Sequence, residues 1–113
     1  MSGLLPRRRA ALLLALLPPV WSAARAAEAV TASVTIDNFS FTPAVLTVAR
    51  GTKVVWTNRD DIPHTVVSDA RPPVFRSPAL DTDETFEAVF DRPGRWGYFC
   101  ALHAHMQGSI VVR

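Results

Sequence analysis

Apolar and polar positions alternate along most of this chain, in short runs that are rich in valine, threonine and aromatic residues. Within such a run every second side chain points to the same face, as Val34 and Ile36 do in VTASVTI or Val54 and Trp56 in KVVWTN. This period of two predicts β-strands. The predicted strands cover residues 30–36, 44–48, 53–58, 84–90, 95–100 and 108–113.

Turn-forming residues separate these runs, at residues 42–43, 49–51, 71–74 and 92–95. In the last of these turns, Pro93 and Gly94 suit the two central positions of a type II turn. The segment ALHAHMQ (101–107) favours a helix by composition, but seven residues between two strands are too few to sustain one. We therefore expect a compact connection there, and an all-β sandwich or barrel for the domain as a whole.

The first 30 residues follow a different pattern. A basic stretch (Arg7–Arg9) precedes an apolar run from Ala10 to Leu17, and small residues follow near Ala24 to Ala27. This order predicts a secretory signal peptide, residues 1–26, with cleavage after Ala26 and a mature domain at 27–113. The prolines at 18 and 19 end the apolar run too early for a membrane anchor. We expect export, to the periplasm or an equivalent compartment, by either the general or the twin-arginine route.

The signal peptide accounts for the positive charge of the chain. Without its four arginines, 8 of the 12 basic residues remain against 10 acidic ones, a net charge of about −2. No basic patch with interleaved aromatic residues is left, so nucleic-acid binding is not expected. Stable membrane insertion after cleavage is not expected either.

The sulfur-containing and imidazole side chains of the protein are concentrated in GYFCALHAHMQG (97–108). This stretch holds the only cysteine, two of the three histidines and one of the two methionines. A single cysteine cannot form a disulfide within the chain, so it is a buried thiol, an intermolecular link, a ligand or a nucleophile. Cys100, His103 and Met106 follow one another at intervals of three in a predicted turn, and His64 stands upstream at the start of another apolar run.

Taken singly, these residues have ordinary explanations, such as a buried apolar cysteine, a satisfied histidine or a gap-filling methionine. Taken together, two imidazoles, one thiolate and one weak thioether are the donor set of a blue-copper electron-transfer site. Zinc is the competing metal, but structural zinc sites usually contain more cysteine, and thioether is a poor zinc ligand. We therefore predict one copper ion held by His64, Cys100, His103 and Met106.

At these residues the chain resembles the cupredoxin family of type 1 blue copper proteins, and within it the amicyanins and pseudoazurins. NFSFTPAVLTVARGTKVVWTNRDDIPHTVVS is similar to the family's N-terminal strands and first ligand, and FDRPGRWGYFCALHAHMQGSIVVR to its C-terminal hairpin. The Cys-x2-His-x2-Met loop has the length found in amicyanins. The resemblance implies a Greek-key β-sandwich or barrel of about seven to eight strands.

The resemblance also implies roles for single residues. His64, Cys100 and His103 would be the equatorial ligands and Met106 the axial one. Asn58 would tie the two ligand-bearing segments together, and Pro63 would stiffen the approach to His64. The chain departs from amicyanins at Ala104, where they have a proline, which predicts a more flexible loop.

His105 lies between two of the predicted ligands. We expect it to be a solvent-facing loop residue; the alternative is that it competes for the metal or tunes docking with pH.

If four side chains coordinate the ion, no coordination position stays open for a substrate, in contrast to a catalytic metal site. No nucleophile–base pair or phosphate-binding loop is recognisable, and the acidic stretch DTDET (81–85) is typical of solvated surface. We therefore expect a monomeric, non-enzymatic electron carrier acting between redox partner proteins that the sequence does not identify. The alternatives are a copper chaperone or buffer that delivers the ion, and a metal-free, receptor-like domain of the same fold.

Overall fold

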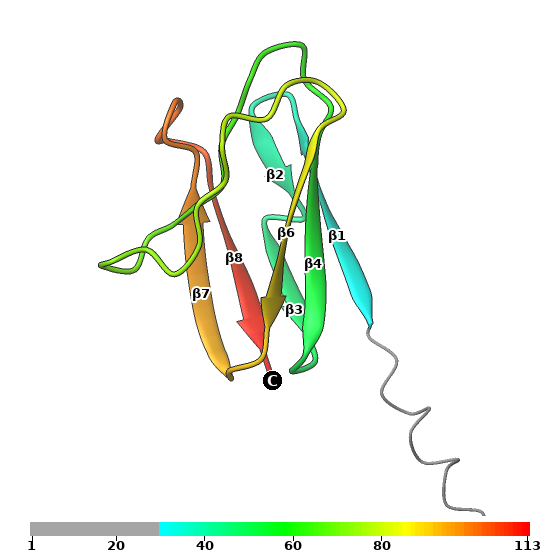
Figure 1. Cartoon of the computed structure of the whole chain (residues 1–113), viewed down its shortest axis with the longest axis vertical. Coiled ribbons are helices and arrows are strands. Elements are labelled where there is room, and N and C mark those ends of the chain that lie inside the picture. The colour runs from blue at the N-terminus through cyan, green and yellow to red at the C-terminus, as the bar shows by residue number, and fades with distance from the viewer. Residues whose placement is uncertain (1–29) are drawn as a thin grey trace, which may run out of the picture.

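The computed structural model describes residues 30–113 as two layers of β-sheet (Figure 1). Each sheet has four strands. The first contains, in spatial order, β2 (Ser40–Thr42), β1 (Thr31–Asp37), β4 (Thr52–Asn58) and β6 (Thr85–Phe90). The second contains β3 (Val45–Val48), β8 (Gln107–Val112), β7 (Gly94–Phe99) and β5 (Val67–Ser68).

The predicted all-β sandwich is confirmed, and all six predicted strands are present with ends shifted by one residue or so. β2 and β5 were not predicted, because three and two residues are too few to show an alternating pattern. The segment 101–107 forms turns and the first residue of β8, as expected, without a helix. Within residues 30–113, no helix is long and apolar enough to cross a bilayer. The predicted signal peptide and its cleavage site lie outside the described residues.

Both sheets mix strand directions. β1 pairs in parallel with β4, and β3 in parallel with β8, whereas the other pairs are antiparallel. Gly94, the first residue of β7, has a φ of 136°, which residues with a side chain rarely adopt. The turn at 92–95 therefore depends on glycine at this position.

The core between the sheets consists of the side chains on the predicted inner faces. Val54 and Trp56 of β4 are fully buried, and so are Ile36 of β1 and Ile110 of β8. The alternation in β4 continues to its last residue, so that Asn58 is also fully buried.

The two sheets place the predicted ligands at one end of the sandwich. β4 runs towards the upper end in Figure 1 and leads into the loop that carries His64. β7 runs in the same direction and leads into the loop 100–106, which carries the other three predicted ligands. The site is therefore made from two loops that lie far apart in sequence and are held by the two different sheets.

Candidate metal centre

Three of the four predicted ligands converge on one point. The ligand atoms of His64, Cys100 and His103 all lie within 4.8 Å of one another. The Nδ1 atoms of His64 and His103 are each 3.8 Å from Sγ of Cys100. Bonds of about 2.3 Å to thiolate and 2.0–2.1 Å to imidazole, the lengths found at zinc, that open about 120° at a shared ion separate the two ligand atoms by about 3.8 Å. The three side chains thus fit one trigonally coordinated transition-metal ion.

His64 is held by its own backbone. Its N–H donates to the carbonyl of Leu80 at 3.1 Å, and its carbonyl accepts from the N–H of Leu80 at 2.7 Å. The side-chain amide of Asn58 donates to the carbonyl oxygens of Leu80 at 2.8 Å and Ile62 at 2.9 Å. Asn58 therefore braces the loop around His64 against the segment before β6. The expectation that Asn58 links this segment to the Cys100 segment is wrong. The side-chain amide donates to these two carbonyl groups, and neither of them lies in the Cys100 segment.

The connection between the two ligand-bearing segments comes from Thr65, which the sequence did not indicate. Its backbone N–H donates to Sγ of Cys100 at 3.4 Å, and its hydroxyl lies 3.8 Å from the same sulfur. The hydroxyl oxygen also accepts the N–H of Ala101 at 2.7 Å. The only signal in the sequence is that a hydrogen-bonding residue follows the first predicted ligand directly.

The loop after β7 is closed by its own backbone hydrogen bonds. The N–H of Cys100 donates to the carbonyl of Met106 at 3.2 Å, the N–H of His103 to Cys100 at 3.2 Å, and the N–H of Met106 to His103 at 2.8 Å. Cys100 and Met106 are buried and His103 is half-buried, whereas Ala104 and His105 are exposed. The loop therefore brings the three predicted ligands to one end of the core and leaves the residues between His103 and Met106 at the surface.

The surroundings of Cys100 favour its thiolate form. Burial raises the pKa of this thiol, but the hydrogen bond from the backbone of Thr65, the contacts with the His64 and His103 rings, and the backbone of Leu102 outweigh it and lower the pKa to about 6. Because the thiolate is the form that binds metals, the site is prepared for an ion at neutral pH.

The opposite edge of the His64 ring faces a carboxylate, which the sequence did not indicate either. Nε2 of His64 lies 2.7 Å from Oδ2 of Asp60, whose side chain is 10% exposed. Burial raises the pKa of Asp60, but hydrogen bonds from the backbone of Phe39 and Asn38 and the contact with His64 bring it below its usual value. Asp60 is therefore ionised at neutral pH, and Nε2 of His64 carries the ring proton, because an ionised carboxylate can only accept.

Apolar side chains surround the exposed edge of the site. The ring of Phe39 meets the rings of His64 and His103 edge to face, at centroid distances of 5.4 and 5.0 Å. Phe39 is 44% exposed and Leu102, next to His103, is 53% exposed. The half-buried His103 ring thus reaches the surface among apolar groups.

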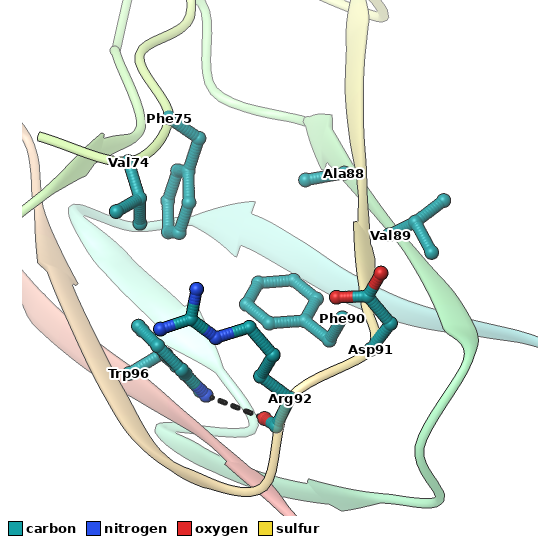
Figure 2. A pocket seen from close by; sticks show the side chains of 8 residues that line it. All are labelled: Val74, Phe75, Ala88, Val89, Phe90, Asp91, Arg92 and Trp96. Carbon is teal, nitrogen blue, oxygen red and sulfur yellow. Dashed lines mark hydrogen bonds between the residues drawn. The ribbon is translucent and has the colours of Figure 1, made fainter.

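A surface hollow of about 220 Å³ lies at the other end of the sandwich, where β6 ends and β7 begins (Figure 2). The guanidinium of Arg92 lies over the ring of Trp96 at 5.7 Å from its centroid, and Nε1 of Trp96 donates to the carbonyl of Arg92 at 3.0 Å. Phe75, Phe90 and the half-exposed aliphatic side chains around them complete its apolar wall. No predicted ligand lines this hollow, so it is separate from the metal centre.

The fold and the donor set together define a β-sandwich copper protein, and comparison with known proteins gives the family. The Cupredoxin-like domain family matches residues 9–112, and the chain belongs to this family. Its cofactor is one type 1 copper ion, which agrees with the His64, Cys100 and His103 side chains gathered at the end of the sandwich and with the buried Met106 in the same loop.

Individual relatives support the same assignment. The chain is 32% identical to amicyanin-alpha of Methylorubrum extorquens over 93 residues, covering 80% of this chain and 78% of that protein. It is 38% identical to the chloroplastic plastocyanin of Tetradesmus obliquus over 84 residues, covering 65% of this chain and 58% of that longer protein. The solved structure of a purple cupredoxin from Nitrosopumilus maritimus superimposes with a TM-score of 0.68 at 32% identity, covering 73% of this chain and 99% of that one. The predicted likeness to amicyanins is confirmed.

Proposed function

We propose that this protein is an exported copper protein that carries single electrons between redox partner proteins. His64, Cys100 and His103 would hold the ion, with Met106 as the weaker fourth ligand. The observation that carries the proposal is the equal 3.8 Å distance from one buried sulfur to the Nδ1 atoms of two imidazoles. A thiolate with two imidazoles and a weak thioether suits copper in both of its oxidation states.

The protein's own contribution is to hold the ligands still. Copper bound there supplies one-electron chemistry between Cu(I) and Cu(II). The hydrogen bonds between Leu80 and His64 fix the first ligand loop, and the hydrogen bond from Thr65 to Cys100 joins that loop to the second one. Because the ligands are anchored to two rigid sheets, their positions change little when the charge of the site changes. Little rearrangement favours fast electron transfer.

Electrons enter and leave through His103. This ring is the half-buried member of the ligand set, and the exposed side chains of Phe39 and Leu102 surround it. An apolar rim of this kind excludes water when a partner protein docks and brings the two redox centres close together. We propose that the partners are redox proteins and that the protein acts as a monomer without enzymatic turnover of its own.

The decisive experiment is spectroscopic. The purified protein loaded with Cu(II) is expected to show the intense sulfur-to-copper absorption and the narrow EPR splitting of a type 1 site, to bleach with a mild reductant and to recover on reoxidation. Cys100→Ser removes the sulfur and is expected to abolish the band. A wild-type protein that binds copper without this band would contradict the proposal.

The same samples distinguish a carrier from a copper chaperone, an alternative that the family relationship does not favour. A carrier keeps its copper through repeated redox cycles, whereas a chaperone gives Cu(I) to a modest chelator. Retention of copper in the presence of such a chelator is the expected result.

Export is tested by measuring the mass of the protein recovered outside the cytoplasm. That mass is expected to correspond to a chain that begins at Ala27.

A further inference from the structure

Asp60 is built into the metal centre although it is not a ligand. It precedes His64 by four residues, and its carboxylate oxygen Oδ2 lies 2.7 Å from Nε2 of that histidine. The Asp60 side chain is 10% exposed and that of His64 is fully buried. A carboxylate therefore contacts the edge of the ligand ring that points away from the ion, out of reach of most solvent.

The backbone of Asp60 is fixed on both sides. Its N–H donates to Oδ1 of Asn58 at 2.9 Å, and its carbonyl accepts from the hydroxyl of Thr82 at 2.6 Å. Asn58 is itself fully buried at the end of β4. The position of the Asp60 carboxylate is thus determined by the sheet and not by a flexible loop.

The carboxylate also organises the tight turn between β1 and β2. Its two oxygens accept the backbone N–H groups of Asn38 at 2.6 Å and Phe39 at 3.0 Å. Both residues have left-handed φ values, 52° and 57°, a conformation that residues other than glycine seldom adopt. The hydrogen bonds to Asp60 stabilise this turn, and the turn places the Phe39 ring against both imidazoles.

We propose that Asp60 is a positioning residue of the copper site that sets the tautomer and orientation of His64 and adds a negative charge that favours Cu(II) over Cu(I). This inference rests on the proposed function. Because the carboxylate accepts the Nε2 proton, the lone pair of Nδ1 is directed towards the position shared with Cys100. The negative charge lies one imidazole ring from that position, where it stabilises the more positive ion and lowers the reduction potential.

The test compares Asp60→Asn with Asp61→Asn in copper-loaded protein produced from the full chain. Asp61 is exposed and adjacent, so its substitution removes an equal charge without altering the hydrogen bond to His64. Asparagine at position 60 removes the charge but keeps the size and an oxygen for the turn. We expect D60N to lower the preference for Cu(II) about tenfold, which raises the one-electron potential by about 59 mV. We expect D61N to shift it by less than a third of that, and the blue band to remain in both.

An equal shift in D60N and D61N would overturn the proposal, because Asp60 would then act only as a surface charge or as a brace for the turn. Loss or absence of the blue band in the wild-type protein would instead contradict the proposed function. If D60N does not fold, the proposal is tested by nitrogen NMR of the wild-type Cu(I) protein, which reports the protonation of the His64 ring. His64 is expected to show a protonated Nε2 in slow exchange with water, and a rapidly exchanging Nε2 proton would overturn the proposal.

Discussion

Thr65 joins the two halves of the metal centre through one hydroxyl group and one backbone N–H. Its hydroxyl accepts the N–H of Ala101 at 2.7 Å and lies 3.8 Å from Sγ of Cys100. Thr65→Val keeps the shape of the side chain but leaves this N–H without its acceptor. We expect the free energy of unfolding of the metal-free protein to fall by about 1 kcal/mol in urea titrations. Thr65→Ser keeps the hydroxyl and serves as the control; equal stability of the valine variant and the wild type would contradict this role.

His105 is a potential ligand whose side chain the loop exposes to solvent. Its ring is exposed, and its centroid lies 6.5 Å from that of His103. We expect His105→Ala to leave the visible absorption and EPR spectra of the copper protein unchanged. His103→Ala, in the same loop, is expected to abolish the type 1 spectrum. A changed spectrum in H105A would show that His105 competes for the ion.

At this scale the sequence predicted the donors but not the residues that hold them. Cys100, His103 and Met106 could be recognised because they share one turn, and His64 because it is the one histidine outside that turn. Thr65 and Phe39 make their contacts with residues that are far away in the chain, Thr65 with Cys100 and Phe39 with Asp60. Asp60 lies only four residues before His64, but no alternating pattern or motif marks that contact. Their side chains are of common types, and only the folded arrangement of the sheets gives them a role.

The pairing of β7 with β8 imposes a requirement for glycine that the alternating pattern does not reveal. Gly108 lies opposite Tyr98, and a Cβ at Gly108 would meet Cζ of that buried ring at 2.6 Å. Gly108→Ala must therefore displace a core side chain or separate the strands. We expect a loss of about 1–3 kcal/mol in the free energy of unfolding, measured by urea denaturation. Gln107→Ala, at the exposed neighbouring position, is the control and should cost much less.

Strand prediction succeeded where the side-chain pattern alone decided the structure. Val34, Ile36, Val54 and Trp56 are buried as their alternation predicted, because both sheets have one face towards a common core. The pattern could not reveal the pairing, which includes parallel β1–β4 and β3–β8 neighbours. Strand order depends on contacts between segments distant in sequence, and the local period of two is the same for parallel and antiparallel neighbours.

For the whole molecule, the metal is expected to act as a cross-link between the two sheets. The three converging donors are brought together only by the fold, so copper binds the folded state in preference to the unfolded one. At a free concentration 1,000 times the dissociation constant, this contributes about 4 kcal/mol to the free energy of unfolding. We expect removal of copper to lower the melting temperature. The effect of copper should disappear in Cys100→Ser, and an equal effect of copper on that variant would contradict the cross-link.

The buried Tyr98 is expected to make the folded protein less stable at alkaline pH. Burial raises its pKa from 10.0 to about 12, because the charged phenolate loses its hydration in the core. Between these two values the unfolded chain has released the proton and the folded protein still holds it, so stability falls as pH rises through this window. We expect urea titrations at pH 9 to 12 to show a loss of about 1–3 kcal/mol attributable to this residue. Tyr98→Phe keeps the ring and removes the ionisable group, so it should be less sensitive to pH over the same range. Identical pH profiles for the two proteins would show that another group causes the alkaline loss.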